Sequence, residues 1–132
     1  LPRLVGMQTA LEWCMTGRLI DAGEALERGL VRSVHPQGEL MDAATGIARE
    51  IADNTSAVSV AMTRAMLWRN GSDGHPMDAH RVDSRAIYRL SRSNDAKEGI
   101  ASFLEKRAPA YPDTVSADMP DFYPWWDEPG YE

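Results

Sequence analysis

The fold is decided by residues 16–31, which read TGRLIDAGEALERGLV. Gly17 follows an apolar helical pattern, at the place where a left-handed helix C-terminal cap is expected. Asp21 and Glu24 have the spacing of a capping box, in which the first side chain accepts from a first-turn N–H and the second reaches back. The stretch therefore predicts a helix that ends, a second helix capped by Asp21, and a stop near Gly29.

The sequence on either side extends this arrangement. On the C-terminal side, the compact β-branched run 30–34 predicts a short strand, and residues 35–38 predict a turn. On the N-terminal side, a helix is predicted from about Met7 to Thr16, with one apolar stripe expected to face the core. That stripe comprises Met7, Ala10, Leu11, Cys14 and Met15, so Cys14 is interpreted as a buried structural thiol.

Two further helices are predicted in the middle of the chain. The first spans roughly residues 39–53 and the second is capped by Thr55 or Ser56 and ends before Asn70-Gly71. Their expected buried residues are Leu40, Ala44, Ile47, Ala48 and Ile51 on the first, and Val58, Met62 and Ala65 on the second.

Two more helices complete the body. One starts at Pro76, which suits a first helical turn, and the other opens with a capping box at Asp95 and Glu98 and is stopped by Pro109 and Pro112. Their expected inward residues are Ala79, Val82, Ala86 and Leu90, then Ile100, Phe103 and Leu104. The chain is therefore predicted to be mainly α with one short strand.

The tail differs in composition from the body, so the chain divides into residues 1–112 and residues 113–132. Residues 108–132 hold six acids, no Lys or Arg, five of the eight prolines and six of the ten aromatic residues. Disordered tails lack aromatic residues, so we expect an extended segment ordered against a surface, with Trp125 and Trp126 in apolar grooves and a second subunit as the expected surface.

Charge, cysteine count and hydropathy exclude several classes of partner. The formal net charge is −6, which gives no general affinity for nucleic acid or for an anionic membrane. No apolar run approaches the ~20 residues needed to span a bilayer. Cys14 is the only cysteine, which favours a cytoplasmic location. Without an initiator Met or a secretory signal, the chain reads as a fragment or a processed half.

No self-contained catalytic site is visible in the residues themselves. His75 and His80 are five apart, so they point to different sides of a helix and cannot form the paired ligands of a zinc site. The carboxylate pairs Asp21/Glu24 and Asp95/Glu98 are explained by helix capping. At the end of the last predicted helix, Lys106 either complements the helix dipole, which is favoured from the residues alone, or binds a phosphate.

Four stretches resemble the crotonase superfamily, the enoyl-CoA hydratase/isomerase family, in order and spacing over residues 1–112. They are Leu1–Gly6, the run 16–31, the two middle helices with Arg64 where Lys is common, and the closing segment with SNDAKEG at 93–99 and FLEKRAP at 103–109. The resemblance implies that the chain is the helical C-terminal half of the α/β crotonase fold. It also implies an acyl-CoA thioester as substrate, with no metal and no covalently bound cofactor.

The resemblance assigns chemistry mainly to residues outside this chain. In the family, two backbone N–H groups stabilise an enolate and two glutamates add water to a 2-enoyl-CoA, and both elements precede the segment that Leu1–Gly6 resembles. Hence no catalytic residue is assigned here. The implied CoA-binding positions are Lys106 for the phosphates, and Ile87 with Tyr88 beside it, where some members carry an aromatic residue.

The resemblance also implies partners and leaves the reaction open. We expect the upstream crotonase half of the same protein and assembly into a homotrimer or hexamer. The expected reaction is enoyl-CoA hydration. The alternatives are another crotonase-type reaction, such as enoyl-CoA isomerisation or acyl-CoA hydrolysis, and a non-catalytic helical oligomerisation module.

Overall fold

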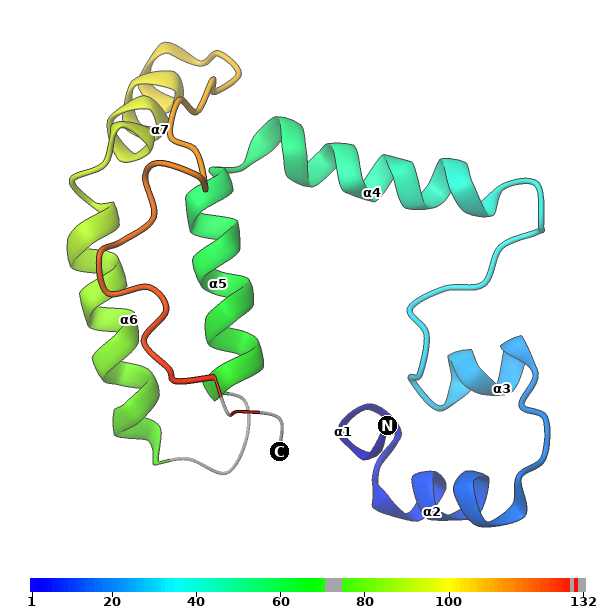
Figure 1. Cartoon of the computed structure of the whole chain (residues 1–132). Helices are drawn as coiled ribbons and strands as arrows, with labels where there is room; N and C mark the ends of the chain where they lie inside the picture. Colours follow the sequence, from blue (N-terminus) through cyan, green and yellow to red (C-terminus); the bar gives the residue numbers. More distant parts are fainter. Residues whose placement is uncertain (71–74, 129, 131–132) are drawn as a thin grey trace. The chain divides into compact units, whose positions relative to one another are not determined.

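The computed structural model describes residues 1–70, 75–128 and 130 of the 132-residue chain (Figure 1). Within these residues all the regular elements are helices and no strand is formed, as a mainly α chain requires. In chain order they are α1 (Pro2–Val5), α2 (Met7–Thr16), α3 (Ala22–Glu27), α4 (Leu40–Asn54), α5 (Ala57–Asn70), α6 (Pro76–Leu90) and α7 (Asn94–Glu105).

The expectation of a strand at residues 30–34 is wrong. The backbone N–H groups of Leu30 and Val31 both donate to the carbonyl oxygen of Ala25, at 2.8 and 3.3 Å. Gly29 makes this return possible because its φ is 75°, a region that favours glycine. The start of this run therefore terminates α3, and the N–H groups of Leu30 and Val31 are not available to a neighbouring strand.

The chain forms two compact units, Leu1–Ala48 and Arg49–Glu132. In the first unit, α2 has the predicted bounds, and Gly17 has the predicted left-handed conformation, with φ 62°. Asp21 caps α3, since its Oδ1 accepts from the Glu24 N–H at 2.8 Å. The Glu24 side chain does not reach back to that cap, because it is bound to Arg18 and Trp13.

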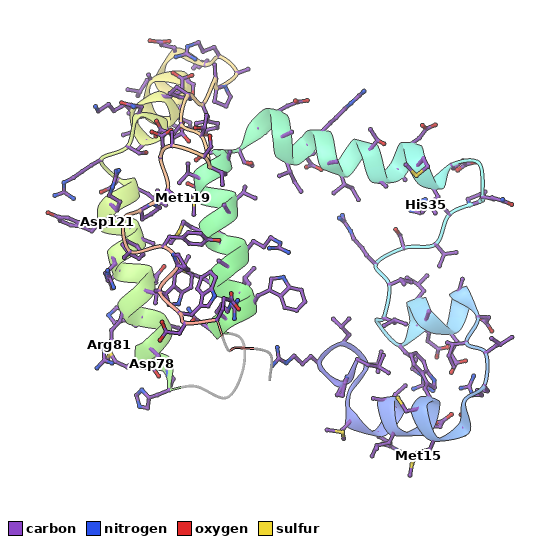
Figure 2. All side chains as sticks on the ribbon, viewed as in Figure 1. Met15, His35, Asp78, Arg81, Met119 and Asp121 are labelled. Atoms are coloured by element: carbon purple, nitrogen blue, oxygen red, sulfur yellow. The ribbon has the colours of Figure 1, made fainter. Side chains whose placement is uncertain are left out.

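The buried face of α2 is not the one that the apolar stripe predicts. Ala10 and Trp13 are buried, whereas Leu11 is 50% exposed and Met15 is 82% exposed. Met15 points away from α3 in Figure 2. Cys14 is exposed too, so the interpretation of a buried thiol is wrong. Trp13 takes the inner position because it packs its large ring inward and still keeps a polar partner, Glu24, for its N–H.

Helix α4 confirms its predicted position but not its predicted burial. Its apolar residues recur at helical spacing, yet none of its residues is buried, and Ile47 and Ile51 are 37% and 46% exposed. An amphipathic pattern shows that a face can be covered, and it does not identify what covers it.

In the second unit, α5 and α6 lie side by side and antiparallel and form the core (Figure 1). Ser56 caps α5 by accepting from the Ser59 N–H at 3.2 Å. Pro76 occupies the first turn of α6, as predicted. Five of the predicted core residues are confirmed, since Val58, Met62, Ala65, Val82 and Ala86 are all buried and Met62 is 0% exposed, whereas Ala79 and Leu90 are only half-buried.

The last helix, α7, begins two residues earlier than predicted and presents a different face. Its cap is Ser93, whose Oγ accepts from the Ala96 N–H at 3.0 Å, and not Asp95. Asp95 is instead buried inside the first turn. The expectation that Ile100, Phe103 and Leu104 point inward is wrong, since they are 64%, 82% and 73% exposed.

Two aspartates join the tail to the start of α7. Asp95 Oδ1 accepts from the backbone N–H of Asp113 at 2.9 Å, and Asp113 Oδ2 accepts from the backbone N–H of Asp95 at 3.1 Å. Asn94 adds a third hydrogen bond to Asp113, at 3.1 Å. We call this reciprocal pair the aspartate clasp.

Beyond the clasp, the tail returns across α5 and α6 of its own unit (Figure 1), and Met119 and Asp121 lie on this returning stretch (Figure 2). Pro120 is fully buried, and Tyr123, Trp125 and Trp126 pack edge to face. The tail is therefore ordered against a surface, as predicted. That surface belongs to the same chain, so no second subunit is needed to order it.

Candidate functional site

The cationic end of α7 is the first part of the candidate site. Helix α7 ends at Glu105, and Lys106 follows in the left-handed region with φ 54° and ψ 41°. The Lys106 side chain is exposed at the carbonyl end of the helix, where a positive charge is favoured by the helix dipole. Among the described residues, none of the ion pairs includes Lys106.

The neighbouring base is in a different situation. Arg107 binds Glu98 with two hydrogen bonds of 2.5 and 2.9 Å, and it binds Glu105 at 2.6 Å. Glu98 also accepts from the Ala110 N–H at 2.7 Å. The hydrogen bonds from Arg107, then that from Ala110, lower the pKa of the Glu98 carboxyl to about 2. Arg107 therefore holds the chain in place after α7, whereas Lys106 takes part in none of the ion pairs among the described residues.

Ile87 and Tyr88 form the second part of the candidate site. Both lie on α6 and are 62% and 65% exposed. Ile87 lines a groove of about 610 Å³ among α5, α6 and α7, whereas Tyr88 lines a separate groove with Phe122 of the tail. The Arg92 guanidinium lies 3.7 Å from the centre of the Tyr88 ring.

The structure does not join these two parts into one pocket. Neither the groove at Ile87 nor the groove at Tyr88 includes Lys106 among its lining residues. Within this chain, the three sequence-predicted positions, Lys106, Ile87 and Tyr88, are therefore separate exposed surface features.

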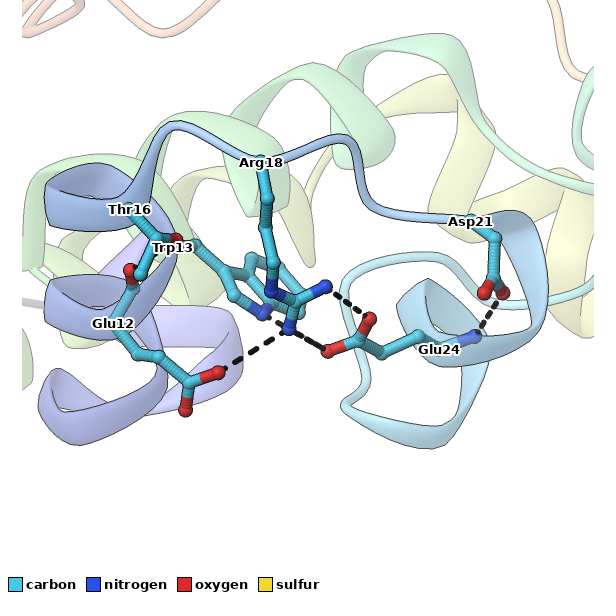
Figure 3. A network of polar contacts seen from close by, with 6 residues as sticks. All are labelled: Glu12, Trp13, Thr16, Arg18, Asp21 and Glu24. Carbon is cyan, nitrogen blue, oxygen red and sulfur yellow. Dashed lines mark hydrogen bonds and ion pairs between the residues drawn. The ribbon is translucent and has the colours of Figure 1, made fainter.

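The first unit contains a polar network that could be mistaken for an acid–base site (Figure 3). Arg18 donates to both carboxylate oxygens of Glu24, at 2.6 and 2.7 Å, and to Glu12 at 3.2 Å. Trp13 Nε1 donates to Glu24 at 3.1 Å. The hydrogen bonds from Arg18 lower the pKa of Glu24 to about 2. A carboxylate held in this way remains ionised at neutral pH, which suits a structural role and not that of a general acid.

Sequence reasoning missed Asp113, whose backbone and carboxylate complete the aspartate clasp. Asp113 is 8% exposed, and burial, the largest single influence on its carboxyl, would by itself raise the pKa. The hydrogen bonds from Asp95 and Asn94 together outweigh burial, so the pKa of Asp113 is lowered. The only available signal was an acid after Pro112 in a tail that holds six acids, which is too weak to identify a clasp.

No metal centre or membrane helix stands out in the parts of the chain that the structure describes. No group of three or more His, Cys, Asp or Glu side chains there is arranged to hold a metal ion. Of the described helices, none is long and apolar enough to cross a membrane.

Comparisons with known proteins agree with this arrangement of helices. The family model described as enoyl-CoA hydratase/isomerase matches residues 1–114. An enoyl-CoA hydratase of Alternaria alternata is 40% identical over 116 residues, which cover 87% of this chain and 38% of that protein. The human enoyl-CoA hydratase domain-containing protein 3, mitochondrial, is 36% identical over 114 residues, which cover 84% of this chain and 36% of that protein.

A solved structure gives the same result in three dimensions. The crystal structure of an enoyl-CoA hydratase from Bacillus anthracis has a TM-score of 0.76 and 34% sequence identity, over 83% of this chain and 42% of that one. The helices that the structure describes are thus the helical C-terminal part of a crotonase fold. The chain belongs to the enoyl-CoA hydratase/isomerase family. It spans about two fifths of the length of the relatives it matches.

Proposed function

We propose that the protein containing this chain hydrates a 2-enoyl-CoA, adding water through an oxyanion-stabilised enolate, and that Lys106 binds the phosphates of CoA. The observation that carries the proposal is the free ammonium of Lys106 at the end of α7, next to an arginine that is already fully paired. Membership of a family whose relatives are named enoyl-CoA hydratases supports the reaction class.

The reacting carbons would be handled by residues outside this chain. The carboxylates that could be taken for catalytic pairs are occupied: Asp21 caps α3, Glu24 binds Arg18, and Glu98 binds Arg107. The upstream crotonase half would therefore supply the oxyanion hole and the two glutamates. A homotrimer or hexamer and a cytoplasmic location are part of the same proposal.

Lys106 is suited to a phosphate because its ammonium is a mobile point charge that can follow a flexible group. The phosphates of an acyl-CoA are remote from its reacting double bond. An interaction at that distance is made equally in the ground state and in the transition state, so it lowers KM and leaves kcat unchanged.

The test is Lys106→Ala in the enzyme assembled with its upstream half. KM for crotonyl-CoA should rise about tenfold, which is ~1–2 kcal/mol of lost binding, while kcat stays nearly constant. The increase should become smaller as ionic strength rises, because salt screens an exposed charge.

Lys97→Ala is the matched control, because Lys97 is an exposed lysine on the same helix at its other end. It should leave both constants unchanged. A Lys106→Ala enzyme with the wild-type KM at low ionic strength would show that Lys106 acts only as a charge at a helix end.

A second experiment tests where the chemistry resides. The purified 132-residue chain should not hydrate crotonyl-CoA, and activity should appear when the upstream half of a crotonase enzyme is supplied. Turnover by the chain alone, at the rate of a complete hydratase, would place catalytic groups within it. Product analysis with 2-enoyl-, 3-enoyl- and saturated acyl-CoA distinguishes hydration from isomerisation and hydrolysis.

A non-catalytic helical oligomerisation module is the second candidate, and one observation favours it. Helix α7 exposes Ile100, Phe103 and Leu104, an unusual amount of apolar surface on one short helix. A module of this kind would self-associate in a sedimentation experiment and would restore no activity to any upstream half.

A further inference from the structure

A cavity of about 360 Å³ lies between α5 and the tail, within the second unit. Six residues line it: Arg64, Ala65, Trp68 and Arg69 from α5, and Tyr123 and Trp126 from the tail. The family match ends at residue 114, so the tail side of this cavity lies outside the family pattern. The proposed hydratase function therefore assigns no role to this cavity.

The aromatic wall on the tail side is held in place by several contacts. The Trp126 ring packs edge to face against Tyr123, with ring centres 5.3 Å apart, and against Trp125, with centres 4.8 Å apart. The Arg69 guanidinium lies 4.3 Å from the centre of the Trp126 ring. Glu128 accepts hydrogen bonds from both Trp126 Nε1 and Arg69. A ring fixed in this way offers a rigid surface that loses little entropy when a ligand packs on it.

The lining carries two arginines, and Glu128 beside it offsets the charge of one of them. None of the described lining residues is acidic. Arg69 is paired with Glu128, whereas Arg64 is exposed and takes part in none of the ion pairs among the described residues. Trp68, which is 66% exposed, adds a second indole on the α5 side.

From these features we propose that the cavity binds a planar aromatic ring that carries an anionic group. The ring would pack against the indoles of Trp68 and Trp126, and Arg64 would bind the anion, because a guanidinium matches the two oxygens of a carboxylate or phosphate. The volume lies within the range of small-molecule sites and is sufficient for a bicyclic ring. The proposal is independent of the hydratase function, since it uses no residue assigned to acyl-CoA.

Calorimetric titration of the full chain tests the ligand class. The probes are 2-naphthoate and adenosine monophosphate as aromatic anions, 2-naphthalenemethanol as the neutral isostere, and inorganic phosphate as an anion without a ring. At least one aromatic anion should bind saturably, and both controls should bind at least about tenfold more weakly. Comparing naphthoate with the nucleotide shows whether a carboxylate or a phosphate is preferred. Equal binding of the neutral isostere, or no saturable binding, would overturn the proposal.

Variants test the assigned residues. Arg64→Gln should weaken binding of the aromatic anion about tenfold, and Arg64→Lys should weaken it less, because lysine keeps the charge but loses the planar fork. Trp126→Leu should weaken binding as well. Arg49→Gln, at an exposed arginine on α4 outside the cavity, is the matched control and should bind like wild type. Unchanged binding in Arg64→Gln, with an unchanged melting temperature, would contradict the assignment.

Discussion

The α5–α6 pair and helix α7 all carry apolar residues at helical spacing, but these residues are buried in the pair and exposed in α7. In α5 and α6 the patterned residues meet one another, and Val58, Met62 and Ala86 are 2%, 0% and 2% exposed. In α7 the patterned residues Ile100, Phe103 and Leu104 face outward, while the buried positions are polar, Asp95 and Ser102. The difference teaches that periodicity locates a helix and its apolar face, whereas burial also requires a complementary face within the same chain.

The largest expected effect comes from truncating the most buried side chain. Met62→Ala should reduce the free energy of unfolding by about 2–5 kcal/mol, since it leaves a cavity between α5 and α6. The matched substitution Ile100→Ala, at a residue that is 64% exposed, should change it by less than about 1 kcal/mol. Chemical denaturation of both variants measures the difference. Equal losses would mean that the two faces are buried alike and would remove the contrast.

The aspartate clasp provides the next test, because it replaces apolar packing at the start of α7 with hydrogen bonds. Asp113→Ala should cost about 1–3 kcal/mol, since it leaves the buried Asp95 N–H without its acceptor. The clasp should also make stability depend on acid. The folded-state pKa of Asp113 is below its unfolded value of about 3.9, so the ionised carboxylate contributes fully to the free energy of unfolding above that value.

As pH falls from about 5 through the lowered folded-state pKa, this contribution is lost. Melting temperatures of wild type and Asp113→Asn, measured from pH 7 to pH 2, should therefore converge at the acid end. A constant gap across that range would indicate that Asp113 does not titrate differently in the folded and unfolded states.

The smallest expected effect concerns the Arg18 network in the first unit. Arg18→Gln removes three charge-assisted hydrogen bonds to Glu12 and Glu24, yet Arg18 and Glu12 are exposed and Glu24 is only half-buried, and pairs near the surface contribute little. The melting temperature should fall slightly at low ionic strength, and the difference should nearly vanish at 1 M salt. A large loss that persists in salt would show that this network supports a core as α5 and α6 do.

Much of the fold could be predicted from the sequence where the information is local. Gly17, Asp21 and Pro76 act at helix ends through their own backbone or side chain, and each was assigned correctly. The burial of Val58, Met62 and Ala65 was also predicted, because α6 follows α5 and supplies a complementary face.

The errors occur where a partner decides the outcome. Leu30 and Val31 donate to Ala25 instead of to a strand, and the described chain offers no strand for them to pair with. Asp95 is not a cap because Ser93 accepts from the N–H of Ala96, and the Asp95 carboxylate instead accepts from the N–H of Asp113. The role predicted for Lys106 came from a family motif, and only the structure shows that Arg107 is paired while Lys106 is in none of the ion pairs among the described residues.

The backbone conformation of Lys106 lowers the stability of the helix end, whereas its side chain is required for the proposed phosphate contact. With φ at 54°, the residue has a backbone that glycine adopts readily and that other L-residues disfavour by roughly 1–2 kcal/mol. A glycine here would be the more stable choice for ending α7, and it would carry no ammonium. The chain thus carries a cation at a position where stability alone favours glycine, and the proposed contact with CoA phosphate would account for that choice.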